Sequence, residues 1–317
     1  MKTWAVSNQK GGVGKTTTVV SLGGLLSSWG FRVLLIDLDP HGSLTSYFKM
    51  NSDELELSVY NLFHDTGLKK KNISPTPYIV KTEFEGISVL PASTAIATLD
   101  RQVASLGGMG LVISNALKNV SDEYDYVIID SPPMLGILMI NALAACQHII
   151  IPSLAEHLAL KGLERMVNTV KMVFKSRKTP PGYTIVPTMF DKRTKATREG
   201  LIILRQTYPD NIWNSVIPID TKIRDASLQG IPAPLYDANS KAVEAYAELV
   251  ELLLQEKIAS RDMVAQEGLD WVISKAKLLL ESTRGSLIAG VGLVVLMWAA
   301  TRVLRHIEAA LNDIWEI

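Results

Sequence analysis

The chain has 317 residues, 32 basic and 32 acidic side chains, and one cysteine. This length fits one large α/β domain with an appendage, or two modest domains. The zero net charge excludes a protein that is basic throughout, so any nucleic-acid surface would have to be a local patch. The single cysteine, Cys146, excludes a disulfide framework and a zinc cluster made of thiolates from one chain.

From the N-terminus onward, short apolar runs alternate with stretches of helical period, which is typical of a parallel α/β sheet. Seven runs are predicted as strands: Thr3–Ser7, Arg32–Asp37, Ile87–Leu90, Tyr126–Asp130, His148–Pro152, Tyr183–Pro187 and Ser215–Ile217. The predicted helices include Lys15–Trp29, Ala95–Asn119, Leu158–Lys175, Lys195–Tyr208 and Ser240–Glu256. We therefore expect a doubly wound, mostly parallel α/β domain over residues 1–257. No signal-peptide pattern precedes the first strand, so this domain is expected in the cytoplasm.

A glycine-rich segment, KGGVGKTT, follows the first predicted strand and opens the first predicted helix. Glycines suit a phosphate-binding loop because backbone N–H groups must approach the phosphate oxygens closely, and the helix N-terminus adds partial positive charge. In such a loop the lysine reaches the terminal phosphates and the hydroxyl that follows binds Mg²⁺. The expected nucleotide-binding residues are Gly11, Gly12, Val13, Gly14, Lys15, Thr16 and Thr17. Gln9 occupies the first glycine position of the usual pattern, and a second lysine, Lys10, precedes the glycines.

Two other predicted strands end in carboxylates. The segment LLIDLDPHG carries Asp37 and Asp39, and the segment YVIIDSPP carries Asp130. A carboxylate at the C-terminal edge of a parallel sheet, beside a phosphate loop, suits the shell of a magnesium ion. Each aspartate alone could instead cap a helix, but their combination with the loop favours a nucleotide site. No N-K-x-D sequence for reading guanine is present, so ATP is expected rather than GTP.

The segments KGGVGKTT, DLDPHGSLT and DYVIIDSPP, in this order and spacing, resemble the ParA/MinD ATPases, a P-loop class with a deviant Walker A sequence. The likeness continues through VLPAS, PTMFDKR and YDANSKAVEAYAELV, and it covers residues 1–257. The resemblance implies a homodimer in the ATP state that sandwiches the nucleotides, with Lys10 reaching the phosphates of the partner. Hydrolysis would then be slow and dependent on dimerisation and Mg²⁺.

The resemblance also assigns roles to single residues. It implies that Lys10, Lys15 and Asp39 are catalytic, with Asp39 positioning or activating the attacking water, and that Thr16 and Asp130 hold Mg²⁺. One residue departs from the family: His41 stands where the family more often has glutamine, and the sequence assigns it no catalytic role.

The family has several branches, and the sequence excludes some of them. An iron–sulfur reductase needs two cysteines per chain, and a tandem arsenite-pump ATPase needs a longer chain. The remaining role is DNA partitioning, or the positioning of a large cargo such as a chemotaxis or flagellar assembly, with a ParB-like or adaptor protein as activator. The alternative is a membrane-anchored, MinD-like regulator that binds ATP and hardly hydrolyses it. A metabolic ligase or reductase has no supporting substrate motif.

Basic side chains gather between positions 171 and 205 with few acidic ones. Such an excess could bind non-specific DNA through its phosphates and place the protein on the nucleoid, although a charge run is more often a solvated helical face. A pole-associated location is the other expectation. The candidate DNA-binding residues from this stretch are Lys192, Arg193, Lys195 and Arg198. The resemblance adds Lys222 and Arg224, which fall where ParA relatives often carry basic residues, although the local sequence IDTKIRDAS departs from their usual pattern.

Residues 258–317 are predicted as a helical appendage. Its segment 285–301, GSLIAGVGLVVLMWAAT, has no charged residue, and its length is at the short end of the roughly 17–25 residues that cross a bilayer. The C-terminal appendage as a whole, over about 58 residues, resembles a fragment of the YihY/BrkB-type membrane proteins. Two interpretations stay open: segment 285–301 is a transmembrane helix that anchors the ATPase to the inner membrane, or the appendage is an accident of gene fusion.

Overall fold

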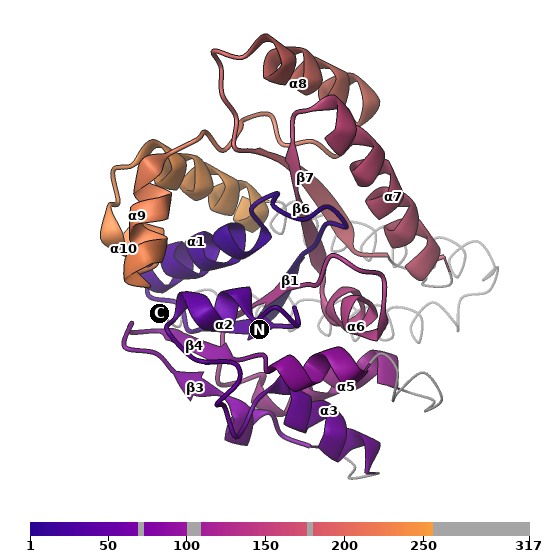
Figure 1. The fold of residues 1–317 in the computed structure, drawn as a ribbon, viewed down its shortest axis with the longest axis vertical. Helices are drawn as coiled ribbons and strands as arrows, with labels where there is room; N and C mark the ends of the chain where they lie inside the picture. Colours follow the sequence, from indigo (N-terminus) through magenta and orange to yellow (C-terminus); the bar gives the residue numbers. More distant parts are fainter. Residues whose placement is uncertain (69–72, 100–108, 176–179, 256–317) are drawn as a thin grey trace, which may run out of the picture. The chain divides into compact units, whose positions relative to one another are not determined.

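The computed structural model describes residues 1–68, 73–99, 109–175 and 180–255, and Met1–Glu251 form one compact unit. Within the described residues, seven strands form one sheet in the order β3-β4-β2-β5-β1-β6-β7 (Figure 1). They are β1 Lys2–Val6, β2 Val33–Asp37, β3 Val80–Lys81, β4 Ile87–Leu90, β5 Tyr126–Asp130, β6 His148–Leu154 and β7 Gly182–Thr188. Neighbours are parallel except β3 and β4, so the predicted doubly wound, mostly parallel sheet is confirmed.

The central strands read as continuous apolar runs because helices cover both of their faces. All five residues of β2 and of β5 are buried. The parallel register then brings the carboxyl ends of three strands to one edge, where Val6 of β1 and Asp37 of β2 both lie opposite Asp130 of β5. The chain winds away from this edge in both directions, which is the place where doubly wound folds bind ligands.

Helices cover both faces of the sheet (Figure 1). On one face lies α1, packed against the short α10, with α9 beside it and a further helix over 241–255. On the other face α3, α5, α6 and α7 lie side by side, and α8 packs on α7. Their bounds are α1 Lys15–Ser28, α2 Ser43–Tyr47, α3 Val59–Gly67, α5 Val112–Leu117, α6 Ile137–Ala145, α7 His157–Val173, α8 Lys195–Thr207, α9 Thr221–Gln229 and α10 Ala233–Tyr236. Short 3₁₀ helices span Thr76–Tyr78, Thr94–Thr98, Met109–Leu111 and Lys118–Val120.

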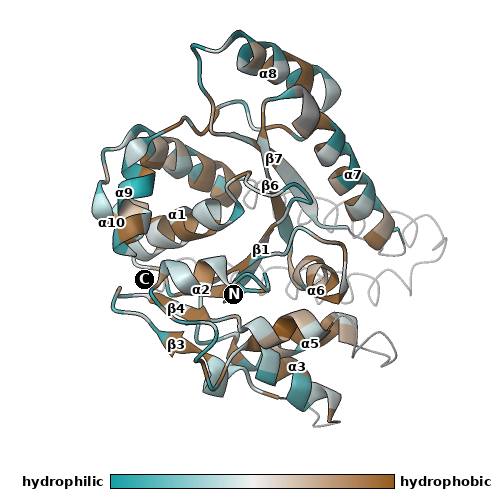
Figure 2. Ribbon diagram, viewed as in Figure 1, coloured by the Kyte–Doolittle hydropathy of each residue, from teal (hydrophilic) through white to brown (hydrophobic). Residues whose placement is uncertain are grey.

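Hydropathy follows this layering. Figure 2 shows α1 and α6 as largely hydrophobic, whereas α7 and α8 carry hydrophilic residues between hydrophobic ones. In α1 the residues Val19, Val20, Leu22 and Leu26 are buried. A buried pair of hydroxyls, Thr18 in α1 and Tyr246 in the helix over 241–255, lies at 3.0 Å and joins these two helices.

Most predicted elements are confirmed, and the departures have physical reasons. The predicted strand Ser215–Ile217 is wrong: this segment forms no strand, and isolated bridges lie only on either side of it, at Ile212 and Pro218. Pro218 lacks the N–H that would continue a ladder. Of the predicted helix Ala95–Asn119, the described parts are helical but mostly as 3₁₀ turns around the short α5, and residues 100–108 lie outside the described ranges. Strand β3 was missed because two residues, Val80 and Lys81, carry no periodic signal.

The predicted appendage 258–317, its apolar segment 285–301 and the boundary after residue 257 lie outside the described residues and stay predictions. Among the helices of the described ranges, none has both the length and the apolar composition needed to cross a bilayer.

Candidate nucleotide site

The glycine-rich loop connects β1 to α1 and is held by hydrogen bonds from other elements. Gly12 and Gly14 have φ angles of 72° and 86°, the left-handed region that favours glycine, and Gly14 caps α1. The Asn8 amide donates to the Pro152 carbonyl at 2.7 Å, and the Thr188 hydroxyl donates to the Val13 carbonyl at 2.8 Å. The loop is therefore fixed on both sides, by the ends of β6 and β7.

The two lysines of the loop lie in different surroundings. Lys15 is buried at the start of α1 and lines the cavity in front of the loop. Lys10 does not line this cavity, and its Nζ atom lies 4.0 Å from Glu156 Oε2 at the start of α7. One lysine therefore faces the site of its own chain, and the other lies outside it.

Three carboxylates meet at the edge of the sheet, and two of them are fully buried. Burial, followed by repulsion from Asp37, raises the pKa of Asp130 to about 8. Burial also raises the pKa of Asp37 to about 6, against the hydrogen bonds that Thr45 donates to it. Asp39 is buried beside them. Burial therefore disfavours the charged form of Asp37 and Asp130, and a bound cation would favour it.

Asp130 shows directly that a cation fits here. Its Oδ2 atom accepts a hydrogen bond of 2.6 Å from the Thr16 hydroxyl. Its Oδ1 atom is buried and has no hydrogen-bond partner among the described residues. Carboxylate and hydroxyl oxygens are hard ligands that suit Mg²⁺, which keeps several waters and usually takes only one or two protein carboxylates. The described residues hold no cluster of three or more metal-ligating side chains, and such a lightly held Mg²⁺ does not need one.

A cavity of about 700 Å³ opens in front of the loop. We call it the P-loop cavity, and it is lined by Gly11, Gly12, Gly14, Lys15, Thr16, Thr17, Asp39, His41, Ser43, Ser46, Tyr47, Pro133, Met189 and Ser227. It brings together Lys15, Thr16 and Asp39, which the sequence predicted as site residues. Its volume is within the range of small-molecule sites, roughly 300–1,000 Å³.

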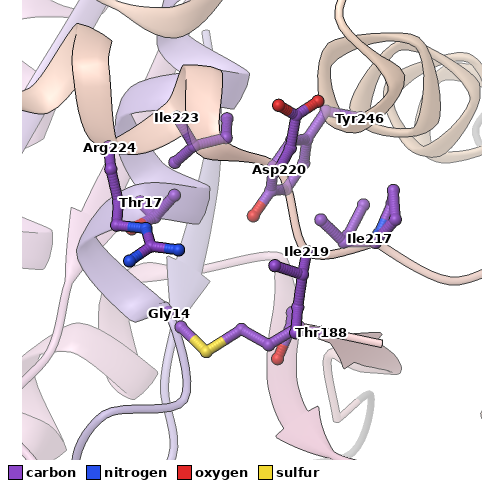
Figure 3. A pocket seen from close by; sticks show the side chains of 11 residues that line it. Gly14, Thr17, Thr188, Ile217, Ile219, Asp220, Ile223, Arg224 and Tyr246 are labelled. Atoms are coloured by element: carbon purple, nitrogen blue, oxygen red, sulfur yellow. The ribbon is translucent and has the colours of Figure 1, made fainter. Parts of the chain in front are cut away.

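A second pocket of about 360 Å³ adjoins it and was not predicted. We call it the apolar pocket. It shares Gly14, Thr17 and Met189 with the P-loop cavity, and its other walls are Thr188, Ile217, Pro218, Ile219, Asp220, Ile223, Arg224 and Tyr246. Figure 3 shows Ile217, Ile219 and Ile223 around it. The Asp220 carboxylate is occupied, because it accepts N–H bonds from Lys222 and Ala242. The pocket therefore offers mainly apolar contact, which suits a flat aromatic ring.

The comparisons with known proteins agree with this geometry. Residues 1–180 match the family AAA_31, described as an AAA domain. The chain is 36% identical to the sporulation initiation inhibitor protein Soj of Bacillus subtilis, over 78% of this chain and 96% of that protein. It is 33% identical to the chromosome-partitioning ATPase Soj of Treponema pallidum, over 84% of this chain and 98% of that one. A crystal structure of cobyrinic acid a,c-diamide synthase from Mycobacterium smegmatis, with ADP and magnesium bound, is 31% identical with a TM-score of 0.70, covering 82% of this chain and 96% of that chain.

This chain belongs to the ParA/MinD family of P-loop ATPases. The match to this chain covers nearly the whole length of the two Soj proteins. The ParA-type ATPase domain predicted from KGGVGKTT, DLDPHGSLT and DYVIIDSPP is therefore confirmed. The resemblance of the last residues to YihY/BrkB-type proteins is not shown by these comparisons.

The six candidate DNA-binding residues of this ParA-type chain fall into two groups. Near the start of α8, four exposed residues form local contacts: Arg193 with Asp191 at 2.8 Å, Lys195 with Glu199 at 3.5 Å, and Arg198 with the carbonyl of Lys192 at 2.8 Å. On α9, Lys222 lies 3.9 Å from Asp237, and Arg224 lines the apolar pocket. Figure 1 shows α8 and α9 in separate places. The four exposed residues of the first group therefore lie near one another at the start of α8, apart from the exposed Lys222 and Arg224 on α9.

Proposed function

We propose that this chain is a ParA-type switch that binds ATP and Mg²⁺, hydrolyses ATP slowly as a dimer, and thereby partitions DNA or positions a large cellular cargo. The observation that carries the proposal is the buried Asp130 oxygen without a partner, beside the Thr16 hydroxyl and Lys15. A bound cation would satisfy such an oxygen, and a phosphate loop with its lysine lies next to it. Two relatives named Soj, one of them described as a chromosome-partitioning ATPase, support the cellular role.

The described residues would each have a distinct role in binding and hydrolysing ATP. Lys15 and the backbone of Gly11–Thr17 would hold the phosphates, and Thr16 and Asp130 would hold Mg²⁺, which neutralises phosphate charge when bound. The apolar pocket would take the adenine ring. In hydrolysis, a water oxygen bonds to the γ-phosphorus as the bond to the bridging oxygen of ADP breaks. Asp39 accepts the water proton, and the products are ADP and phosphate.

Dimer dependence is supported by the place of Lys10. Because this lysine lies outside the cavity of its own chain, its ammonium group is available for the phosphates of a second copy. Turnover would then require two chains, and a ParB-like or adaptor protein could control it by acting on the dimer. Light scattering of the full chain tests this. Asp39→Ala with Mg·ATP should form a stable dimer, whereas Lys10→Ala should stay monomeric.

Turnover of the full chain tests the enzymatic part of the proposal. Wild type should hydrolyse Mg·ATP, and Lys10→Ala and Asp39→Ala should each lower the rate by about 100-fold or more. Lys81→Ala, an exposed lysine on β3 away from the cavity, serves as the matched control and should keep the wild-type rate. If wild type itself hardly hydrolysed Mg·ATP, and Asp39→Ala left that low rate unchanged, the chain would instead be a binding switch of the MinD-like kind.

Cosedimentation with non-specific duplex DNA at near-physiological salt tests whether the basic residues near the start of α8 bind DNA. ATP-dependent binding that Lys195→Ala with Arg198→Ala weakens would support partitioning on DNA, because exposed cations neutralise phosphates. Lys222→Ala should have less effect, since Asp237 lies beside it. Absence of binding with either nucleotide would favour a membrane or a cell pole as the surface. The Mycobacterium smegmatis relative is named a synthase. ATP turnover that DNA stimulates would distinguish a partitioning ATPase from a synthase of that kind.

A further inference from the structure

His41 lies in a tight turn that folds its side chain back onto Asp39. The Gly42 N–H donates to the Asp39 carbonyl at 2.9 Å, and Gly42 adopts a φ of 60° before α2 begins. Pro40 occupies the second position of this turn, where its fixed φ is favourable. The sequence Asp39-Pro40-His41-Gly42 therefore sets the place of the imidazole by backbone geometry, before any ligand binds.

Both hydrogen bonds from His41 reach the same carboxylate oxygen. Asp39 Oδ1 accepts the backbone N–H of His41 at 3.1 Å, and His41 Nδ1 lies 2.8 Å from it. A carboxylate can only accept, so Nδ1 carries the proton in this contact. Among the described residues, no hydrogen bond is found on Oδ2 of Asp39. The pair of bonds therefore fixes the rotation of the carboxylate and leaves Oδ2 for water.

The side chains of Asp39 and His41 differ strongly in their exposure to solvent. The side chain of Asp39 is 12% exposed, whereas that of His41 is 79% exposed, and both line the P-loop cavity. The only other charged side chain on the lining is Lys15, among the described residues. His41 thus holds the aspartate from the solvent side, while the buried edge of the sheet confines it from behind.

We infer that His41 is a positioning residue for Asp39: its Nδ1–H fixes the Asp39 carboxylate in the orientation that takes the proton of the attacking water. This inference rests on the proposed function, in which Asp39 accepts that proton. A hydrogen bond to an ionised acceptor is stronger than a neutral one and orients its partner. A misplacement of about 1 Å in a reacting group can cost about 100-fold in rate, so a support of this kind affects turnover more than binding.

Three variants of the full chain separate positioning from a merely structural role. His41→Ala removes the side-chain bond and should lower kcat about ten- to a hundredfold while the affinity for a fluorescent ATP analogue with Mg²⁺ changes less than about twofold. His41→Asn should restore most of kcat, because its amide nitrogen can occupy the place of Nδ1. Asp39→Ala should abolish turnover. That result would show that turnover depends on Asp39, as the proposed function requires.

A spectroscopic measurement gives a readout that does not depend on turnover. Side-chain ¹⁵N NMR of the histidines should show His41 as the Nδ1–H tautomer in wild type, with this signal absent in His41→Asn and changed in Asp39→Ala. The inference is overturned if His41→Ala keeps wild-type kcat, if it loses ATP affinity and kcat in parallel, or if His41→Asn is as slow as His41→Ala. Turnover that does not depend on Asp39 would instead overturn the proposed function.

Discussion

The P-loop cavity and the apolar pocket share three residues, yet they are built on different principles. The P-loop cavity is lined by a lysine, hydroxyls and the Asp39 carboxylate, and hydrogen bonds hold Asp37 and Asp130 beneath it at the ends of parallel strands. The apolar pocket is formed mainly by isoleucines, Met189 and Tyr246 from segments far apart in the chain. Charged chemistry requires particular residues at fixed spacing, whereas apolar contact requires only shape and volume.

The two regions also differ in what a ligand would change. Beneath the P-loop cavity, Asp37 and Asp130 lie opposite each other on neighbouring strands, and both pKa values are raised by burial. A bound cation would relieve this unfavourable electrostatic energy. In the apolar pocket the Asp220 carboxylate already accepts hydrogen bonds and most other walls are apolar, so a ligand gains mainly through the removal of apolar surface from water. Substitutions in the two regions should therefore have effects of different size and kind.

The largest expected effect is at Asp130, beneath the P-loop cavity. Asp130→Asn removes the charge that the Mg²⁺ shell needs, so turnover of Mg·ATP should fall about 100-fold or more. Asp125→Asn, just before the opposite end of β5, where Asp125 pairs with Arg32 at the surface, is the matched control and should keep the wild-type rate. Steady-state phosphate release measures both. If Asp130→Asn kept more than a tenth of wild-type turnover, Asp130 would not hold the metal.

The same carboxyl should make stability depend on pH in the absence of metal. The folded chain keeps the Asp130 proton up to about pH 8, whereas an unfolded chain releases it near pH 4. The folded state then holds more protons, so the free energy of unfolding falls as pH rises. Between pH 6.5 and 8 the expected loss is up to about 2 kcal/mol. Asp37, with its pKa raised to about 6, and His148, with its pKa lowered to about 4 by burial, act mainly below this window.

Urea unfolding in EDTA at several pH values measures this slope. Asp130→Asn should unfold with nearly the same free energy at pH 6.5 and pH 8, because its amide does not titrate. A wild-type protein as stable at pH 8 as at pH 6.5, or an equal slope in the variant, would show that the Asp130 carboxylate is better solvated than its burial indicates.

The contrast between the two regions also explains what the sequence could predict. Lys15, Thr16 and Asp130 are marked by glycine spacing and strand ends, and the structure brings these three residues together. Arg224, which stays a predicted DNA contact, also lines the apolar pocket, because its position in the family pattern does not record which cavity its helix faces. Ile219 carries no motif, and the segment PTMFDKR, in which Met189 lies, does not predict a pocket. Their role arises only when β7, the segment after it and α1 are folded together.

The smallest expected effect concerns the apolar pocket and separates it from the P-loop cavity. Ile223→Ala removes apolar contact from one wall, so the affinity for Mg·ATP should weaken about fivefold, the equivalent of about 1 kcal/mol. Leu228→Ala on the same helix removes a side chain that is 83% exposed and does not line the pocket, so its affinity should match wild type.

Calorimetry with inorganic tripolyphosphate and Mg²⁺ completes this comparison, because that ligand has the phosphates of ATP and no base. If the apolar pocket holds the base, Ile223→Ala should bind tripolyphosphate as wild type does while it binds ATP more weakly. Equal weakening for both ligands would mean that Ile223 supports the loop through α1 rather than contacting the base. The two regions would then form one site, in which the apolar residues act by holding the P-loop in place.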